Sequence, residues 1–268
     1  MLCSFTVPRG DSAVAPALVS AVTSAIVPAR EVTASFVNDA LELLVARLDV
    51  LPETVRAAAA LLSEEEQQRA GRFAFDRDRR RYVVARAGLR ELLAARLGVR
   101  PEAVELRYGP YGKPTLVREF CRGNLRFNLS HCGDVAVYAF ARGREIGVDV
   151  EAVRVLPDGD DIAARFFSVR ENETYRGLDE RDQPLGFFNC WTRKEAYIKA
   201  LGEGLSHPLD SFDVSLAPGE PAQILRSGNI AGDHCGWQLF SFAPLPGCIG
   251  AVVIENPARK RIASRMLS

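Results

Sequence analysis

The sequence has no excess charge of either sign, since its 34 basic and 34 acidic side chains cancel over 268 residues. A chain without net positive charge has no general attraction for nucleic acid or for anionic membranes, so we expect neither as a partner. No apolar run approaches the roughly 20 residues that span a bilayer. Hydrophobic residues make up 47% of the chain, which is enough for a globular core and excludes global disorder.

Patterns that bind zinc or form disulfide frameworks are also missing. The six cysteines include no CxxC pair and have no regular spacing, and the three histidines lie far apart at positions 131, 207 and 234. Both zinc binding and a disulfide framework are therefore disfavoured. Scattered thiols are typical of a cytoplasmic protein, which is the location we expect.

The alternation of helix and strand patterns predicts an α+β fold made of two halves. Residues 1–38 contain the interrupted apolar stretch AVAPALVSAVTSAIV and no charged segment at its start, so we interpret them as an extension rather than as a leader. Helical patterns followed by strand patterns then occur twice, in an N-terminal half over 39–146 and a C-terminal half over 147–258. Residues 259–268 form a tail.

Local signals place the elements of both halves. Residues 41–48 read as a strand or short helix, and Ser63 followed by Glu66 is a capping box that starts a helix at Glu64. Asp76 or Asp78 then caps a longer helix that ends at Gly98. Short alternating runs between 104 and 152 predict an antiparallel meander. Helices are expected at 162–167, 169–178 and 187–201, and strands at 211–217, 222–227, 236–242 and 248–255.

The stretch GVDVEAV, residues 147–153, places two acids on one short strand. Because strand side chains alternate between faces, Asp149 and Glu151 point the same way and need a shared positive charge. The alternative is an exposed strand face on which both acids are simply solvated.

A second dense motif, WTRKEAYIKALGEGL over 191–205, is helical, with Asn189 as a candidate cap and Gly202 at its end. Its Glu195 and Lys199 are four residues apart and share a face, as in an ordinary surface ion pair. If this helix packs over the acidic strand, Glu195 joins the two strand acids. Carboxylate oxygens suit Mg²⁺, which commonly takes substrate phosphates as further ligands.

Two further stretches carry polar groups suited to a ligand. Lys113 is presented by a rigid Gly-Lys-Pro turn, and Ser130 and His131 end an alternating strand whose core face is Leu125, Phe127 and Leu129. Adjacent strand residues face opposite ways and no GxSxG is present, so a catalytic Ser-His pair is disfavoured. Ligand contact is the expected use, and a structural hydrogen-bonding pair the alternative. Among the arginines of RRRYVVARAGLR, most are expected to be solvated and one or two to bind phosphate.

Together, YGKP, FNLSH, GVDVE and WTRKEAYIKALGEGL, in this order, resemble the 4′-phosphopantetheinyl transferases, most closely the monomeric type that activates surfactin synthetase. The resemblance runs from about Leu62 to Val214. It implies two pseudo-symmetric subdomains, each a small antiparallel sheet packed with helices, with coenzyme A in the cleft between them. It also implies Mg²⁺-dependent transfer of the phosphopantetheine arm of coenzyme A to a serine of an acyl or peptidyl carrier protein, releasing adenosine 3′,5′-bisphosphate. A catalytically silent binder of coenzyme A or of carrier protein is the alternative.

The resemblance also implies a role for individual residues. Metal ligands would be Asp149, Glu151 and Glu195, and Lys199 would contact the phosphates and protonate the leaving group. The residues implied to contact coenzyme A are Lys113, Ser130, His131, Arg81, Arg69, Lys194 and Lys199. Glu171 matches the base for the acceptor serine, although Ser168 and Glu171 also form an S-x-x-E capping box. Glu66 stands where the family often has a lysine.

Overall fold

The computed structural model describes residues 26–28, 41–117, 120, 124–227, 230–231 and 236–256. The predicted tail lies outside these residues, as does most of the predicted extension. A short strand within that extension, β1 (Ile26–Pro28), pairs antiparallel with β2 (Leu41–Arg47). None of the described helices combines the length and apolar character needed to cross a membrane.

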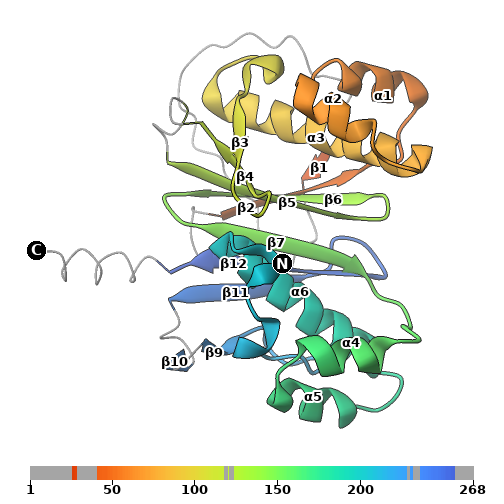
Figure 1. The fold of residues 1–268 in the computed structure, drawn as a ribbon, viewed down its shortest axis with the longest axis vertical. Coiled ribbons are helices and arrows are strands. Elements are labelled where there is room, and N and C mark those ends of the chain that lie inside the picture. The colour runs from red at the N-terminus through yellow and green to blue at the C-terminus, as the bar shows by residue number, and fades with distance from the viewer. Residues whose placement is uncertain are drawn as a thin grey trace, which may run out of the picture.

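The first half combines one four-stranded sheet with three helices and a small hairpin. The sheet order is β1-β2-β6-β5, with β5 at Leu125–Cys132 and β6 at Val135–Arg142. The remaining elements are α1 (Pro52–Ala59), α2 (Glu64–Ala70), α3 (Asp76–Leu97), the 3-10 turn η2 (Pro101–Ala103), β3 (Leu106–Tyr108) and β4 (Pro114–Leu116). The helices cover the outer face of the sheet (Figure 1).

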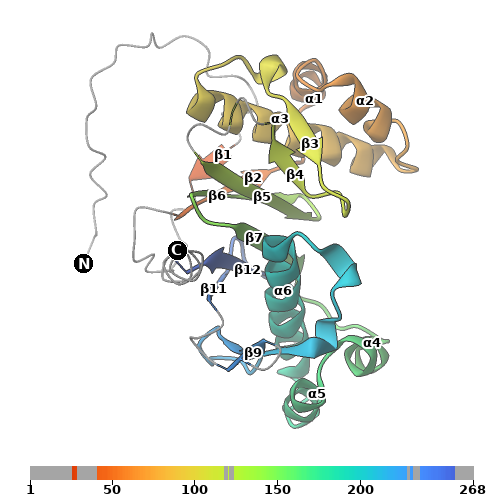
Figure 2. The same cartoon turned by 60° about the vertical axis from the view of Figure 1, so that its left-hand side comes forward.

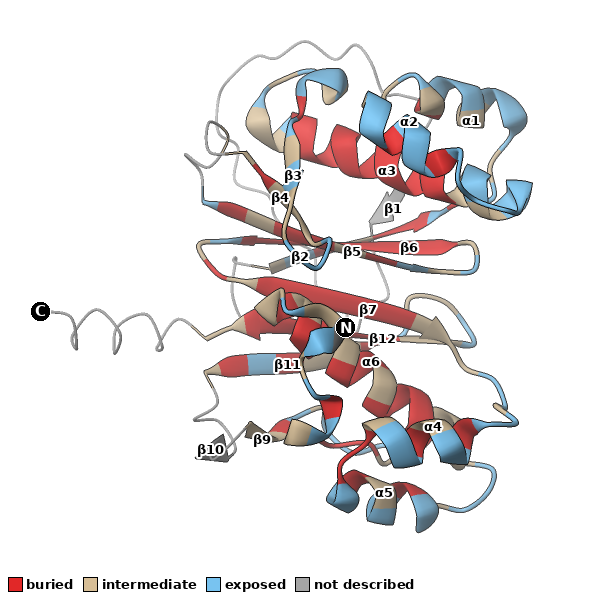
Figure 3. Ribbon diagram, in the orientation of Figure 1, coloured by how far each residue is buried: buried red, intermediate tan, exposed pale blue. Residues whose placement is uncertain are grey.

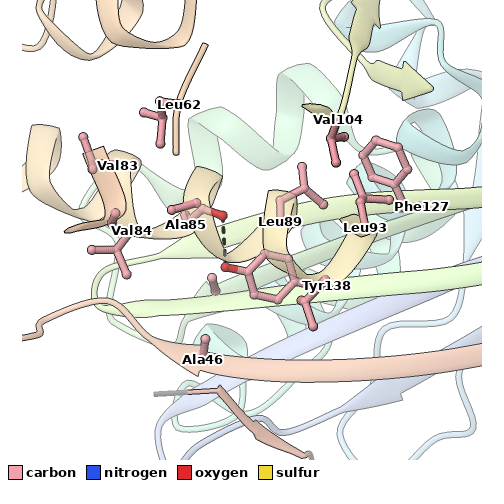
Figure 4. Close-up of a cluster of buried hydrophobic side chains, with 14 of the residues drawn as sticks. Ala46, Leu62, Val83, Val84, Ala85, Leu89, Leu93, Val104, Phe127 and Tyr138 are labelled. Atoms are coloured by element: carbon pink, nitrogen blue, oxygen red, sulfur yellow. Dashed lines mark hydrogen bonds between the residues drawn. The ribbon is translucent and has the colours of Figure 1, made fainter. Parts of the chain in front are cut away.

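Helix α3 is the centre of this first half. Leu89 and Leu93 are fully buried in its core, and the Tyr138 hydroxyl of β6 donates to the carbonyl of Ala85 at 3.0 Å (Figure 4). Gly98 ends the helix in the left-handed conformation with φ of 70°, as predicted, because glycine has no Cβ to oppose it.

The predicted start signals of these helices had mixed outcomes. The Ser63–Glu66 capping box is present at the start of α2, with both hydrogen bonds formed. The prediction that Asp76 or Asp78 caps α3 is wrong, because Phe75 occupies the cap position and makes no side-chain cap bond. The two aspartates instead lie in the first turn, where their negative charges interact favourably with the positive end of the helix dipole.

The second half is built on β7 (Ile146–Ala152) and α6 (Gln183–Leu201). Its sheets have the orders β11-β12-β7 and β10-β9-β8. The remaining elements are α4 (Gly159–Phe166), α5 (Val169–Arg176), η4 (Gly204–Ser206), η5 (Leu209–Ser211), β8 (Phe212–Val214), β9 (Ile224–Ser227), β10 (Ile230–Ala231), β11 (Trp237–Phe242) and β12 (Cys248–Glu255). Mixed α and β structure with small antiparallel sheets packed by helices is therefore confirmed.

The expected continuous meander is wrong at β7. Strand β6 already has β2 on one edge and β5 on the other, so it offers no free edge to β7. Strand β7 pairs instead with β12, in a register that places Asp149 opposite Ala251. The sheet faces of the two halves then meet in a shared apolar cluster that includes Val137, Val148 and Val252 (Figures 1 and 2). Buried residues run along β6 and β7 at this junction (Figure 3).

Helix α6 begins earlier than predicted. It starts at Gln183, and Asn189, the predicted cap, is buried inside it with its side-chain amide donating to the carbonyl of Leu216 at 2.9 Å. The predicted end at Gly202 is confirmed, with φ of 78°.

Helix α6 packs unusually close to β7 at Gly147. A Cβ at this position would lie 2.1 Å from the carbonyl oxygen of Ala196 and 2.3 Å from the amide nitrogen of Ala200. Both are helix backbone atoms that cannot rotate away. Glycine in this strand is therefore required by the close approach of another backbone.

We expect Gly147→Ala to destabilise the protein by about 1–3 kcal/mol, because the helix must move off the strand to admit one methyl group. Chemical denaturation monitored by circular dichroism measures the change. Gly159→Ala is the matched control, since its Cβ would meet its nearest neighbours, Leu156 Cβ and the Tyr175 hydroxyl, at an ordinary 3.4 Å. Equal stability of the two variants would contradict the packing argument.

Candidate active site

Four charged side chains come together where α6 lies on β7. Asp149 and Glu151 are two residues apart on β7 and share a face, as the alternation predicted. Glu195 and Lys199 are one helical turn apart on α6. The helix and the strand pack closely along this line, so residues from two distant parts of the chain form one charged group.

The best-defined part of this group is a contact between three side chains. The Lys199 Nζ donates to Asp149 Oδ1 at 2.6 Å and lies 3.2 Å from Ser130 Oγ. Ser130, which comes from β5 in the first half, donates to the same Asp149 oxygen at 2.9 Å. The two halves of the chain thus meet at Asp149. The sequence placed Ser130 at a ligand site, and the structure places it against the acidic strand.

The second oxygen of Asp149 has no partner. Asp149 is 4% exposed, and its buried Oδ2 makes no hydrogen bond to any described residue. An unsatisfied buried carboxylate oxygen costs free energy unless another group binds it. This atom is therefore suited to bind a cation or a ligand donor.

Both neighbouring glutamates, Glu151 and Glu195, have a pKa above the ordinary value. Burial raises the pKa of Glu151, and the charge of Asp149 raises it further. Burial likewise raises the pKa of Glu195, with Asp149 and Glu151 adding to the effect and Lys199 opposing it. Burial and neighbouring acids thus disfavour ionisation of both glutamates. Three acids face only Lys199 and the Arg154 guanidinium 3.8 Å from Glu151, which leaves the group short of positive charge.

Lys199 stays protonated in this setting. Burial opposes its charge, but Asp149, Glu195 and Glu151 outweigh that effect and raise its pKa above the ordinary value. The lysine is thus held as an ammonium ion beside the carboxylates.

The donor set fits Mg²⁺ in its chemistry. It offers carboxylate oxygens only, an excess of negative charge and one buried oxygen without a partner. The oxygens are not gathered at one point, however. Within the described ranges, no three His, Cys, Asp or Glu side chains lie together in a way that could hold a metal ion. That the three acids meet around one cation therefore stays a prediction. Here Lys199 holds Asp149 on one side, and Glu151 turns toward Cys132 and Arg154.

Lys194, predicted to contact coenzyme A, and Glu171, predicted to act as the base, lie buried together in the core and outside this group. Lys194 has no exposed surface. Its Nζ donates to the carbonyls of Leu209 at 2.6 Å and Phe212 at 2.7 Å and pairs with Glu171 Oε2 at 2.7 Å. An ammonium group with its three donors used inside the core has none left for coenzyme A.

Glu171 is equally committed to the interior. It is 2% exposed, completes the capping box of α5 with Ser168, and accepts a hydrogen bond from the amide of Val214 at 2.7 Å. Its oxygens accept from the Ser168 and Val214 amides and pair with Lys194, and the carboxylate is buried, so an incoming serine cannot reach it in this arrangement. The capping-box alternative is the one that the structure confirms.

The remaining predicted contacts are spread along the junction of the two halves. Lys113 Nζ donates to the carbonyls of Ile146 and Ala200, each at 3.1 Å, and lies 3.6 Å from a Glu145 carboxylate oxygen. His131 sits on the opposite strand face from Ser130. Although part of the residue is exposed, surrounding protein and the charge of Lys199 lower the pKa of its imidazole.

The predicted phosphate-binding arginines lie on the helices of the first half. Arg81 makes a paired contact with Asp49 at 2.8 and 2.6 Å, and Arg69 lies over the Tyr82 ring at 5.8 Å. Glu66, at the position of the family's lysine, is buried against Arg86 and Arg90. Its side chain is therefore part of the core and not of a phosphate site.

Sequence reasoning did not assign a contact to Cys132, and it placed Asn128 with Ser130 and His131 as a polar residue near the end of the strand. Cys132 Sγ lies 3.5 Å from Glu151 Oε2, and Asn128 Oδ1 accepts a hydrogen bond from the amide of Val148 at 2.9 Å. The signal was present in FNLSHC, where Asn128, Ser130 and Cys132 alternate with the core residues and so share one face.

Comparisons with known proteins agree with this architecture. A family model described as "4′-phosphopantetheinyl transferase, N-terminal" matches residues 49–142, and one described as "4′-phosphopantetheinyl transferase superfamily" matches residues 145–242. Together the two models cover both halves of the fold.

Curated relatives extend this match over most of the chain. The 4′-phosphopantetheinyl transferase HetI of Nostoc sp. is 36% identical over 222 residues, which are 83% of this chain and 90% of the relative. The 4′-phosphopantetheinyl transferase Sfp of Bacillus subtilis is 31% identical over 198 residues, which are 74% of this chain and 84% of the relative. The chain therefore belongs to the 4′-phosphopantetheinyl transferase family.

Proposed function

We propose that this enzyme transfers the 4′-phosphopantetheine arm of coenzyme A to a serine of an acyl or peptidyl carrier protein, with Mg²⁺, and releases adenosine 3′,5′-bisphosphate. The observation that carries the proposal is the buried, partnerless Asp149 Oδ2 beside Lys199 and two glutamates of raised pKa. A group with this charge deficit is suited to a divalent cation that carries a diphosphate. Family membership supplies the reaction class.

We also propose that the enzyme acts as a cytoplasmic monomer. The charged group is built from β5, β7 and α6 of a single chain, so no second copy is needed to complete it. The described cysteines, Cys132, Cys190 and Cys248, are all free, as expected in a reducing compartment.

The reaction requires positive charge around the diphosphate of coenzyme A. The serine oxygen forms a bond to the phosphorus that carries the pantetheine arm, and the bond from that phosphorus to the adenosine bisphosphate breaks. Asp149, Glu151 and Glu195 would hold Mg²⁺, which would supply charge to neutralise the diphosphate oxygens. Lys199, protonated and held by Asp149, is placed to stabilise the leaving phosphate and to give it a proton.

Groups from the first half would hold the rest of the coenzyme. Ser130 and His131 lie near the end of β5, where Ser130 contacts Lys199 and the charge of Lys199 acts on His131. We propose that both residues contact the phosphates of coenzyme A. Arg81 and Arg69 are proposed to bind the 3′-phosphate. The Asp49 carboxylate that Arg81 now contacts is 54% exposed, and an ion pair of that kind contributes little and is easily exchanged for a phosphate.

The base for the acceptor serine must lie among the charged group once Glu171 is set aside. Glu195 is only half-buried, and its carboxylate makes no hydrogen bond within the described part of the chain. A carboxylate of raised pKa that binds a metal through one oxygen can accept a proton through the other, directly or through one water. We therefore propose Glu195 in place of Glu171.

Incubation of the purified protein with coenzyme A, Mg²⁺ and a panel of apo carrier proteins tests the proposal. The expected result is a carrier whose mass, measured by mass spectrometry, rises by one phosphopantetheine arm, with no gain when the metal is chelated. Coenzyme binding without transfer to any carrier would support the silent homologue instead.

We expect Asp149→Asn to lower the transfer rate by about 100-fold or more, because it removes a charge that holds the cation while keeping the shape of the side chain. Turnover and the thermal melting curve are measured together, and melting should stay close to that of the wild type. Glu173→Gln, an exposed acid on α5, is the matched control and should transfer normally. Normal turnover of Asp149→Asn would refute the metal assignment.

We expect Glu171→Gln and Lys194→Met each to cost about 3–5 kcal/mol of stability, because each leaves a buried charge without its partner. Urea denaturation measures this cost. The kcat of the folded protein, taken at a temperature where both variants are native, should stay within a few-fold of the wild type. If Glu171 is the base, Glu171→Gln instead loses about 100-fold or more in kcat with little loss of stability.

A further inference from the structure

Lys113 lies at the point where three parts of the fold meet. It directly precedes β4, in a hairpin whose tight turn is closed by hydrogen bonds from the Gly109 amide to the Lys113 carbonyl and from the Gly112 amide to the Gly109 carbonyl. From the first half its side chain crosses to the second half. There its ammonium contacts the carbonyl of Ile146, at the start of β7, and the carbonyl of Ala200, at the end of α6.

The two carbonyls belong to the two elements that carry the charged group. Ile146 is three residues before Asp149 on β7, and Ala200 directly follows Lys199 on α6. Ala200 lies in the last turn of its helix, where carbonyls lack helical partners and the dipole favours a cation. One ammonium group thus ties the strand to the helix and both to the first half.

A second contact lies next to the first. Gly204, in the turn after α6, has φ of 57°, and a Cβ there would lie 2.9 Å from the Tyr111 Cβ. Gly202, which ends α6, approaches the Lys113 side chain closely enough that its Cβ would meet Lys113 Cδ at 3.5 Å. Both glycines permit the hairpin to rest directly on the end of the helix.

The Lys113 side chain has little capacity for another partner. It is 14% exposed, and the Glu145 carboxylate stands 3.6 Å from its Nζ, beside the two carbonyls. Burial lowers the pKa of Lys113, and Glu145 opposes this shift. The two carbonyls take two of the three ammonium donors, and the Glu145 carboxylate stands within ion-pair distance of the group.

We propose that Lys113 is a positioning residue that clasps β7 to α6 and so sets the distance between the strand acids and Glu195 with Lys199. The proposal rests on the function proposed above, and it differs from the coenzyme contact that the family resemblance implies for this lysine. Removal of the clasp lets the end of α6 move relative to β7. Misplacement of reacting groups by about 1 Å can cost about 100-fold in rate.

The test compares Lys113→Met with Arg107→Met. Arg107 is an exposed residue of the same hairpin, so its loss removes one positive charge from that hairpin but leaves the clasp intact. At saturating coenzyme A and Mg²⁺, Lys113→Met should lower kcat by about 10- to 100-fold, while Arg107→Met should not. The dissociation constant for coenzyme A, measured by calorimetry, should change by less than about threefold in both variants, since neither side chain contacts the coenzyme.

A second variant and a second measurement separate positioning from folding. Tyr111→Ala removes the ring that lies against Gly204 but keeps the Cβ, and it should give a smaller loss of kcat with a wild-type melting temperature. Hydrogen exchange of the segments 108–116 and 196–204 should rise in Lys113→Met and not in Arg107→Met. This readout needs no transfer, so it tests the clasp even if the wild-type enzyme modifies no carrier.

Two results would overturn the proposal. One is coenzyme binding at least tenfold weaker in Lys113→Met with kcat restored at saturation, which identifies a coenzyme ligand. The other is unchanged hydrogen exchange in Lys113→Met, which shows that no clasp was removed.

Discussion

The contact between α6 and β7 is the constraint on which the rest of the structure depends. The helix comes so close to the strand that only a glycine fits at position 147. This proximity puts Glu195 and Lys199 beside Asp149 and Glu151 and takes all four partly out of water. Burial and mutual repulsion then raise the pKa of both glutamates, while the acids keep Lys199 charged. The charge deficit of the site is therefore a consequence of backbone packing.

In each half, a buried ion pair joins the start of a short helix to the long helix. In the first half, the capping-box residue Glu66 of α2 pairs with Arg86 and Arg90 of α3. In the second half, the capping-box residue Glu171 of α5 pairs with Lys194 of α6. Each glutamate thus closes the start of a short helix and fixes it to the long one. Such pairs are costly to break because either partner alone is a buried charge.

The residues of the motif WTRKEAYIKALGEGL have different roles because they face different surroundings in this packing. Successive helix positions are separated by about 100°, so neighbouring residues of the motif point to different surroundings. Lys194 points into the core and binds Glu171, while Glu195 faces the acidic strand and Lys199 reaches Asp149. A motif shared across a family can therefore combine folding residues with residues of the site.

Much of the fold could be predicted from local chemistry. Alternation in FNLSHC and GVDVE predicted the strands and the shared face of Asp149 and Glu151, and the two S-x-x-E boxes predicted helix starts that the structure contains. Glycines 98 and 202 predicted the ends of α3 and α6. These features can be predicted from the sequence because they depend on contacts between residues a few positions apart.

Tertiary packing fixed the partners of the side chains with several possible uses. Local patterns were enough to predict most strands and helices, the charged motifs and, through the order of those motifs, the family, but they did not predict β1 or α1. They could not show that β7 leaves the first sheet, that Lys194 and Glu171 satisfy each other in the core, or that Lys113 reaches two carbonyls 33 and 87 residues away. Those outcomes depend on which elements pack together and on how closely, and distances between remote segments are not encoded in any local pattern.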